Sequence, residues 1–403
     1  MRYILHDLEV LLDKEKKMAF VAGPRQVGKT TLAQAMLKAT SSQEGYFNWD
    51  IDDHRRAILK DTQLFWQSVS PRIKCLVFDE IHKYPRWKKF LKGFYDAHRN
   101  DIEIIVTGSG RLDVYQRGGD SLFGRYHQYR LFPYSVGELV FKEKSPRSPE
   151  EAMAFLLESY EPSSASAFEQ LWNFNGFPEP LFQANKRALG RWQNDHHHLI
   201  LREDLRDLTQ IRELGLVENL IALLPERVGS PLSVNSLREN LEVNFKTVQN
   251  WLMNLDRLYY LFFLRPYTGK LARTLKREEK VYFYDWSELH DEGKRFENLV
   301  ALHLLKTCAY WTDAGYGQFS LHYVRDKEKR EVDFLICKQH MPFALIEAKY
   351  AADNIDSSLP YFKDRLKPKF AFQVIGSGKE PDFLKRSGDI YLCAAPRFLA
   401  AFL

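Results

Sequence analysis

The sequence predicts an α/β protein of several domains, the first of which is built on a parallel β-sheet. Apolar runs of strand length at residues 18–23, 75–80 and 102–109 alternate with helical patterns such as TTLAQAMLK and RWKKFLKGFYDAHRN. This alternation is typical of a buried parallel sheet with helical crossovers. The chain has 403 residues, which is too long for one ordinary core, so several domains are expected.

Composition excludes several other classes of protein. Hydrophobic residues make up 45% of the chain and charged residues 28%, which is enough apolar surface for folded cores. The four cysteines stand apart without a CxxC pair, which argues against a disulfide framework or a zinc site. No secretory signal or membrane-length apolar stretch is visible. We therefore expect a cytoplasmic protein without membrane contact, whose net charge of +5 permits nucleic-acid binding without requiring it.

A phosphate-binding motif directly follows the first predicted strand. Residues 23–30 fit the pattern G-x-x-x-x-G-K-[ST], and a predicted helix begins within them. In such a loop the backbone N–H groups bind phosphate, the lysine offsets the charge of the β- and γ-phosphates, and the threonine hydroxyl ligates Mg²⁺. The predicted ATP-binding residues are Gly23, Pro24, Arg25, Gln26, Val27, Gly28, Lys29, Thr30 and Thr31.

Two carboxylates follow the apolar run that begins at residue 75. We expect Asp79 to hold Mg²⁺ through water and Glu80 to orient and deprotonate the attacking water. Two acids alone often mark only a solvated strand end, but the upstream phosphate loop favours the catalytic interpretation. A further strand is predicted at residues 47–50, and we expect it to lie between the strand before the phosphate loop and the strand before Asp79. Such an intervening strand, with the Glu beside the Asp, is typical of additional-strand ATPases.

Two other elements are candidates for contact with the γ-phosphate. Thr107 and Ser109 end the third predicted strand, where a hydroxyl can sense that phosphate, although such hydroxyls often only form turns. Arg125 is the candidate for stabilising charge on the transferred phosphoryl group, from within the chain or from a neighbouring copy. The alternative for Arg125 is an ordinary solvated arginine.

Several segments together resemble a large bacterial and archaeal family of AAA-type ATP-binding proteins, whose C-terminal part was long annotated only as a domain of unknown function. The resemblance implies a P-loop ATPase core, a winged-helix module and a restriction-endonuclease-like domain. It covers nearly the whole chain. The segments are GPRQVGKTTL, LVFDEIHKYPRW, IIVTGSG, SLFGRYHQYRLFPYSVGEL, NGFPEPL, KVYFYDWSEL, RFENLV, and EVDFLI with IEAK.

Single residues at the phosphate site match the pattern of that family. At two other positions this sequence differs from many AAA ATPases. The Gly-Arg pair that ends in Arg125 recurs in the family pattern. Many AAA ATPases have Asn where this chain offers Thr107 and Ser109, and no clear second-sensor arginine is found in the helical lid, which argues against a hexameric motor. The residues that match the ATP site are Gly28, Lys29, Thr30, Asp79 and Glu80.

The expected domain boundaries follow changes in pattern along the chain. A polar stretch with two prolines interrupts the strand-helix alternation near residue 145, and a mostly helical pattern follows. Residues 232–267 then read as helix, turn, helix and apolar strand, which is typical of a winged helix-turn-helix. The tail returns to an α/β pattern. The predicted domains are an ATPase core at 1–145, a helical lid at 146–225, a winged helix at 226–279 and a nuclease-like domain at 280–403.

Charged residues recur with period two on the last predicted strands. Glu331 and Asp333 share one face of a strand, and Glu347 and Lys349 share one face of the next. Asp333, Glu347 and Lys349 match the D…ExK pattern of PD-(D/E)xK nucleases, and Glu297 matches an acid that many members add. Such a site would hold Mg²⁺ against a scissile phosphate, with Lys349 positioning the water. The alternative is a retained scaffold whose charges form ion pairs.

The predicted winged helix contains the candidate contacts to DNA. Lys246, Gln249 and Asn250 fall in its second helix and carry suitable hydrogen-bond donors. Lys270 and Arg273 lie in the basic loop that follows and would reach phosphates. The alternative is that this module packs domains together and that its charges are solvated.

These observations lead to one hypothesis and one rival. The first is a cytoplasmic ATPase that uses ATP and Mg²⁺ and couples its nucleotide state to a nucleic-acid-binding C-terminal half, for which DNA cleavage is a candidate activity. DNA, a second copy or another protein is the candidate partner. The rival is a slow nucleotide-dependent switch whose nuclease-like domain is an inactive scaffold. ATP turnover with and without DNA separates the two.

Overall fold

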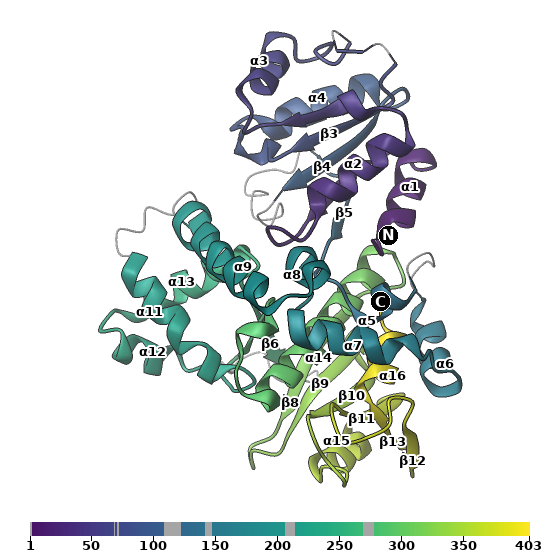
Figure 1. Ribbon diagram of the computed structural model, residues 1–403, viewed down its shortest axis with the longest axis vertical. Helices are drawn as coiled ribbons and strands as arrows, with labels where there is room; N and C mark the ends of the chain where they lie inside the picture. The colour runs from purple at the N-terminus through teal and green to yellow at the C-terminus, as the bar shows by residue number, and fades with distance from the viewer. Residues whose placement is uncertain are drawn as a thin grey trace. The chain divides into compact units, whose positions relative to one another are not determined.

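The computed structural model describes residues 2–67, 69–70, 72–108, 122–141, 147–205, 214–268 and 278–403 (Figure 1). The chain divides into two compact units, Met1–Phe132 and Pro133–Leu403. This division precedes the boundary expected after residue 145. The expected lid, winged-helix and nuclease-like regions all fall within the second unit.

A five-stranded parallel sheet forms the centre of the first unit, in the order β2-β3-β4-β1-β5. Its strands are β1 (Met18–Ala22), β2 (Tyr46–Asn48), β3 (Cys75–Asp79), β4 (Glu103–Gly108) and β5 (Tyr126–Arg130). Every residue of β1 and β3 is buried, as expected for a parallel sheet covered on both faces. The helical segments are α1 (Leu5–Asp13), α2 (Lys29–Ala39), η1 (Gln43–Gly45), α3 (Asp52–Lys60), η2 (Ile81–Lys83) and α4 (Trp87–His98).

The strand order confirms the predicted α/β class and corrects one detail. The strand predicted at residues 47–50 is β2, which lies at the edge of the sheet beside β3. The strand inserted between β1 and β3 is β4, which comes later in the chain. The phosphate loop after β1 and the carboxylates after β3 therefore lie two strand positions apart, at the same carboxyl edge of the sheet, where ligands of open α/β sheets bind.

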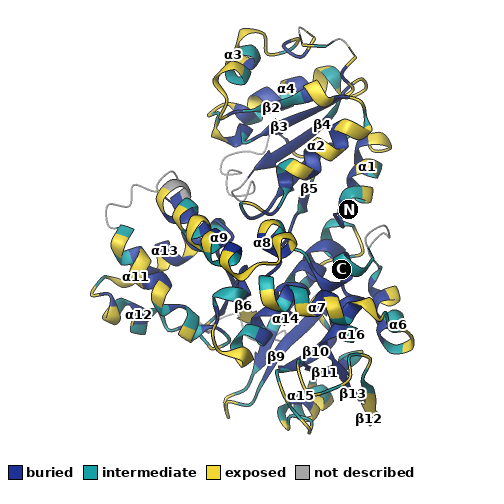
Figure 2. Cartoon of the chain, in the orientation of Figure 1, coloured by how far each residue is buried: buried dark blue, intermediate teal, exposed yellow. Residues whose placement is uncertain are grey.

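Aromatic side chains fill the core of the first unit. The buried residues of α4 include Trp87, Phe90, Leu91 and Phe94, a spacing of three and four that gives the helix one apolar face. Phe78 of β3 meets Phe90 and Phe94 edge-to-face, with ring centroids 5.5 and 5.8 Å apart, a geometry that aromatic rings favour. Figure 2 shows the central strands of this sheet, β1, β3 and β4, as buried and the outer faces of its helices as exposed.

An eight-stranded mixed sheet forms the centre of the second unit, in the order β12-β13-β11-β10-β9-β8-β6-β7. The neighbours β8, β9 and β10 pair antiparallel, whereas β10, β11 and β13 pair parallel. The strands are β6 (Leu261–Pro266), β7 (Lys280–Phe283), β8 (Phe319–Arg325), β9 (Glu331–Lys338), β10 (Met341–Lys349), β11 (Phe370–Ile375), β12 (Leu384–Ser387) and β13 (Ile390–Ala394).

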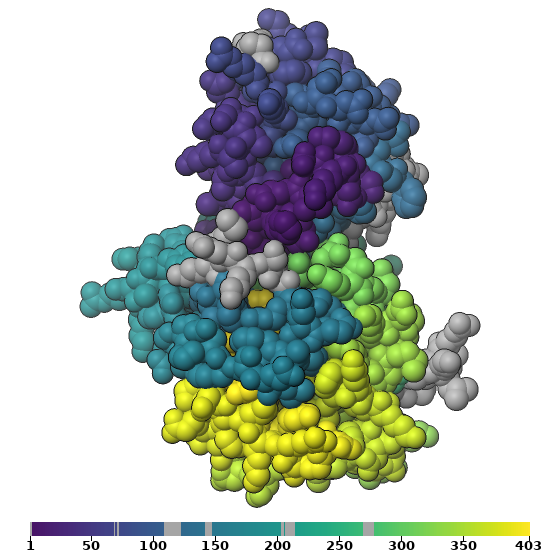
Figure 3. Space-filling view, turned by 90° about the vertical axis from the view of Figure 1, so that its right-hand side faces the viewer, coloured from purple at the N-terminus to yellow at the C-terminus, as the bar shows by residue number. Residues whose placement is uncertain are grey.

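Helices surround this sheet. The long helix α14 (Glu292–Asp313) is mostly buried because it packs on β7, β8, β9 and β10. Figure 3 shows the end of the chain, in yellow, against the segment that follows Pro133, where α16 contacts α5, α6 and α7. The remaining helical segments are α5 (Val136–Val140), α6 (Pro149–Glu158), α7 (Ser163–Phe174), α8 (Pro178–Gln183), α9 (Lys186–His198), η4 (Leu199–Asp204), α11 (Leu214–Leu223), η5 (Pro225–Arg227), α12 (Val234–Asn240), α13 (Phe245–Arg257), η6 (Trp286–Glu288), α15 (Ser358–Leu366) and α16 (Ala395–Ala401).

The helix-turn-helix pattern corresponds to α12 and α13, followed by the antiparallel pair β6 and β7. Strand β6 also pairs with β8, so this hairpin continues the C-terminal sheet. All four cysteines are buried free thiols. None of the described helices is both long enough and apolar enough to cross a membrane.

Candidate functional site

Residues 23–30 form the turn between β1 and α2, and α2 begins at Lys29. Gly28 is the N-cap with a φ of 97°, in the left-handed region that glycine adopts readily. Gly23 is required for a different reason, because a Cβ there would lie 2.2 Å from the carbonyl oxygen of Leu131. The turn therefore presents the backbone N–H groups at the start of α2 at the carboxyl edge of the sheet.

Lys29 lies inside the curve of this loop. Its side chain is buried, and Nζ donates to the carbonyl oxygens of Gly23 and Pro24 at 2.9 and 2.6 Å. Val27 is also buried, whereas Gln26 and Thr31 are exposed and Arg25 is partly exposed. The ammonium is therefore held by the backbone that would surround a bound phosphate.

Three hydroxyl groups from different elements converge on Asp79. Thr30 Oγ1 and the Tyr46 hydroxyl donate to Asp79 Oδ2 at 3.0 and 2.6 Å, and Thr107 Oγ1 donates to Oδ1 at 2.5 Å. Burial, and then the Asp79 carboxylate, raise the pKa of the Tyr46 phenol, which keeps it protonated as a donor. A hydroxyl and a carboxylate 3.0 Å apart are the oxygen donors that Mg²⁺ prefers, so Thr30 and Asp79 fit the predicted Mg²⁺ site.

The predicted sensor residues have different outcomes. The hydroxyl of Thr107 is fully buried and bonded to Asp79, which makes it a partner of the carboxylate, and its role as a γ-phosphate sensor stays a prediction. Ser109 lies outside the described residues.

Glu80 directly follows β3 in an unusual backbone conformation. Its φ is 54°, and its N–H donates to the carbonyl oxygen of Thr107 at 3.0 Å. Its carboxylate lies 3.5 Å from Nε2 of His82. Burial lowers the pKa of His82 despite the opposing effect of Glu80, so a neutral imidazole faces the carboxylate. A non-glycine residue with positive φ at this point is the kind of local strain that clusters at active sites.

Arg125 lies at the wrong edge of the sheet for the predicted role within its own chain. Its carbonyl oxygen accepts from the N–H of Met18, the first residue of β1, whereas the phosphate loop follows the last residue of β1. At about 3.3 Å per residue, the two ends of this strand are about 13 Å apart. The guanidinium instead forms a two-point ion pair with Asp96 of α4, at 2.7 and 3.0 Å. A role in a neighbouring copy stays a prediction.

Sequence reasoning missed Arg2 and Tyr46. The Arg2 side chain is buried, and Nη1 donates to the carbonyl oxygen of Val27 in the phosphate loop at 2.7 Å. Its Nη2 donates to the carbonyl oxygen of Phe132, the last residue of the first unit. Neither residue belongs to the phosphate-binding motif, so their roles emerge only from the fold.

The second unit brings together the predicted nuclease-like residues. Asp333 on β9 and Glu347 on β10 are neighbours, because the N–H of Asp333 donates to Glu347 Oε2 at 3.3 Å. Lys349 Nζ lies 2.6 Å from Glu347 Oε1 and 3.3 Å from Asp356 Oδ2. Burial, and then the nearby Asp333, raise the pKa of Glu347 to about 8 and that of Glu297 to about 7.

Sequence reasoning also missed Lys280, the first residue of β7. Its fully buried Nζ lies 2.7 Å from Glu331 Oε1, 3.3 Å from Glu297 Oε1 and 3.5 Å from Asp333 Oδ1. Burial alone would lower the pKa of this ammonium, but Tyr282 and the surrounding carboxylates raise it well above its ordinary value. Within the described ranges, no three His, Cys, Asp or Glu side chains converge as a metal site requires. With Lys280 beside Asp333 and Lys349 beside Glu347, these two predicted Mg²⁺ ligands do not fit a metal ion.

The predicted DNA contacts on α13 are exposed. Lys246, Gln249 and Asn250 all lie on the surface of this helix, and the exposed apolar side chains of Phe245 and Met253 lie on the same helix. Lys270 and Arg273 lie outside the described residues.

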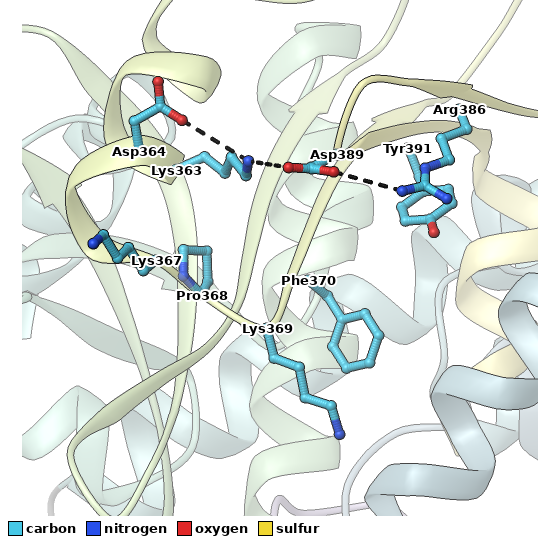
Figure 4. Close-up of a pocket in the computed structure, with 9 residues that line it drawn as sticks. All are labelled: Lys363, Asp364, Lys367, Pro368, Lys369, Phe370, Arg386, Asp389 and Tyr391. Atoms are coloured by element: carbon cyan, nitrogen blue, oxygen red, sulfur yellow. Dashed lines mark hydrogen bonds and ion pairs between the residues drawn. The ribbon is translucent and has the colours of Figure 1, made fainter.

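A polar pocket of about 450 Å³ lies at the start of β11 (Figure 4). Asp389 is flanked by two of its basic side chains, with Lys363 Nζ at 2.7 Å and Arg386 Nη2 at 3.5 Å. Strand β11 runs parallel to β10, and Phe370 pairs with Ala344. The pocket is therefore at the opposite end of these strands from Glu347, and separate from the carboxylate cluster.

Family models match three successive parts of the chain. A model described as "AAA domain" matches residues 15–140, so the first unit carries an AAA-type domain of the P-loop ATPase class. Residues 165–291 match "Domain of unknown function (DUF8612)", and residues 292–391 match "Domain of unknown function (DUF4143)". These two descriptions state no fold or activity, so the winged-helix and nuclease-like interpretations of the second unit stay predictions.

The chain is also similar to uncharacterized proteins of an archaeon and a bacterium. It is 26% identical over 356 residues to the uncharacterized protein MJ1544 of Methanocaldococcus jannaschii, covering 83% of this chain and 75% of that protein. It is 22% identical over 368 residues to the uncharacterized protein Rv2008c of Mycobacterium tuberculosis, covering 89% and 74%.

Similar solved structures include two of the replication initiation protein DnaA. Domain III of the Thermotoga maritima protein matches with a TM-score of 0.27 and 15% identity, covering 43% of this chain and 81% of that chain. The AMPPCP-bound protein of Aquifex aeolicus matches with a TM-score of 0.30 and 13% identity, covering 62% and 86%. The assignment of the first unit rests on its strand order and on the matched AAA domain.

Proposed function

We propose that the first unit binds ATP and hydrolyses it with Mg²⁺. One observation carries this proposal. Thr30 and Asp79 are 49 residues apart in the chain, yet their side-chain oxygens lie 3.0 Å apart at the edge of the sheet where the phosphate loop begins α2. The match to an AAA domain over residues 15–140 supports the same class of activity.

The chain's own residues divide the work of this reaction. The N–H groups at the start of α2 bind the phosphates, and the Lys29 ammonium leaves its two carbonyl partners to offset phosphate charge. Thr30 and Asp79 would hold Mg²⁺, which would supply charge neutralisation at the β- and γ-phosphates. Tyr46 and Thr107 hold Asp79 in place by their hydrogen bonds.

Glu80 takes the proton of the attacking water. A carboxylate beside a neutral imidazole stays available as a base, because an imidazolium at 3.5 Å would compete for its charge. Glu80 is only partly buried, with 14% of its side chain exposed, so water reaches it.

The experiment is phosphate release from ATP by the full chain, with and without Mg²⁺. Wild type is expected to turn ATP over, and Lys29→Ala is expected to lose at least about 100-fold in rate, since a charge contact to the transferred group is removed. Lys38→Ala, at an exposed position of the same helix, is the matched control and should behave as wild type. A Lys29→Ala variant with wild-type turnover would disprove the assignment.

We propose DNA as the partner of the second unit. Fewer observations support this proposal than support ATP hydrolysis by the first unit. Lys246, Gln249 and Asn250 present donors side by side on the exposed surface of α13. Turnover measured with duplex and single-stranded DNA tests this idea, and Lys246→Ala should reduce any stimulation. If DNA has no effect, the slow nucleotide-dependent switch becomes the better proposal. The ammonium of Lys280 inside the carboxylate cluster favours that alternative, and we propose no DNA cleavage.

A further inference from the structure

The C-terminal carboxylate cluster contains its own cation. Lys280 Nζ lies within 3.5 Å of Glu331, Glu297 and Asp333, and the Tyr282 hydroxyl donates to the same oxygen of Glu297 at 2.7 Å. These carboxylates come from α14 and β9, whereas the lysine comes from β7. One ammonium therefore joins three acids that the chain supplies from two other elements.

We propose that Lys280 permanently takes the place of a divalent metal ion in this nuclease-like cluster, which makes the cluster a closed structural joint. A divalent cation binds carboxylate oxygens at about 2.0–2.6 Å. The ammonium already contacts one oxygen each of Glu331, Glu297 and Asp333, and a second cation sharing these oxygens would be strongly repelled.

The backbone around Lys280 closes the cluster from another side. The segment that precedes α12 lies along β7, since the N–H of Leu232 donates to the carbonyl oxygen of Glu279 at 2.8 Å and Pro231 forms a bridge with Lys280. Gly229 approaches Glu297 so closely that an added Cβ would lie 2.8 Å from Oε2. None of the Lys280 side chain is exposed.

This arrangement explains how three acids whose side chains are only 12–23% exposed are accommodated together. Removing one partner of a buried ion pair leaves an uncompensated charge, which is strongly destabilising. Glu297, Glu331 and Asp333 therefore depend on Lys280, and the joint fastens the hairpin that follows α13 to α14 and β9. Glu347 borders the joint, because its Oε2 accepts from the N–H of Asp333. Its own ammonium partner is Lys349 at 2.6 Å, which is 39% exposed and also lies 3.3 Å from Asp356.

The test measures Mn²⁺ binding to the full chain without nucleotide. Electron paramagnetic resonance reports the concentration of free Mn²⁺, and thermal unfolding reports the effect of Mn²⁺ on stability. Any Mn²⁺ at the phosphate loop is common to all variants, so differences between variants report on the cluster. We expect Asp333→Asn to leave wild-type Mn²⁺ binding unchanged. Lys280→Met should melt at a lower temperature than wild type and regain several degrees with about 1 mM Mn²⁺.

Matched variants complete the design. Lys280→Met combined with Asp333→Asn should lose the Mn²⁺ effect, and Lys338→Met, at a partly exposed position of β9, should show none. Lys280→Gln is the second variant if methionine prevents folding. Lys280→Met and Lys280→Gln are also refolded with Mn²⁺ present, and recovery of a cooperative unfolding transition supports the proposal.

Three outcomes would overturn this inference. The first is wild-type Mn²⁺ binding that Asp333→Asn removes, because the cluster would then hold a metal beside Lys280. The second is a folded Lys280 variant that gains no Mn²⁺ affinity. The third is failure of both variants to recover when they are refolded with Mn²⁺.

Discussion

Removing the Tyr46 hydroxyl should weaken Mg²⁺ binding without touching the phosphate loop. Tyr46 donates to Asp79 Oδ2 at 2.6 Å, the oxygen that also accepts from Thr30. A hydrogen bond to a charged group contributes about 1.5–3 kcal/mol. If losing this hydrogen bond weakens Mg²⁺ binding by about 2 kcal/mol, the half-saturating Mg²⁺ concentration of Tyr46→Phe rises about 30-fold. Losses of this size are typical when a residue that hydrogen-bonds to a metal ligand is replaced.

The assay is ATP turnover at saturating ATP as a function of Mg²⁺ concentration. Tyr95→Phe is the matched control, because it also removes a tyrosine hydroxyl from the first unit. The Tyr95 hydroxyl donates to the carbonyl oxygen of Lys16 at 2.9 Å. The control should keep the wild-type Mg²⁺ dependence. An unchanged Mg²⁺ midpoint in Tyr46→Phe would refute the argument that this hydroxyl orients Asp79.

Three further predictions concern the two units separately. Burial lowers the pKa of His303 from 6.5 to about 3, so its contribution to the free energy of unfolding is complete above pH 6.5 and is lost as pH falls toward 3. In urea unfolding, His303→Gln should reduce the dependence of the free energy of unfolding on pH over that range. An unchanged pH dependence would contradict this. Lys306→Met should cost about 3–5 kcal/mol in urea unfolding, because Lys306 Nζ and Glu138 Oε2 form a buried pair at 2.6 Å. Adding Glu138→Leu should recover most of that loss, and no recovery would count against the pair. Arg2→Ala should weaken ATP binding about tenfold in fluorescent-nucleotide titrations, since the loop loses a hydrogen bond to Val27; equal affinity would exclude a positioning role.

The phosphate site was predictable because its signals are local. The spacing of Gly23, Gly28 and Lys29 directly after an apolar run contains the strand, the turn and the start of the helix in one stretch of sequence. Asp79 and Glu80 likewise follow their own strand. Local sequence does not contain the order of the strands in the sheet. For this reason β2 was expected between β1 and β3, the position that β4 occupies.

Arg125 shows how the same limitation affects a role predicted within the chain. It precedes its strand, so in a parallel sheet it lies at the amino edge, away from the phosphates. The motif around it carries no information on which edge it occupies until β5 is paired with β1. Its partner Asp96 comes from another helix.

The C-terminal cluster was half predictable for a related reason. Period-two spacing correctly indicated that Glu331 with Asp333, and Glu347 with Lys349, would share faces of neighbouring strands. Lys280 gave no such signal, because a single lysine at the start of an apolar strand is usually solvated. Only the pairing of β6 with β7 and β8 brings it to the acids.

Hydrolysis of pre-bound ATP by the Glu80→Gln variant tests the central claim most directly. ATP is bound to excess protein without Mg²⁺, Mg²⁺ is added, and samples are quenched over time to separate binding from chemistry. Wild type should convert the bound ATP, whereas Glu80→Gln should bind ATP equally well and hydrolyse it at least about 100-fold more slowly, because an amide cannot accept the proton of water. Equal rates in the two proteins, or bound ATP that wild type never hydrolyses, would contradict the account.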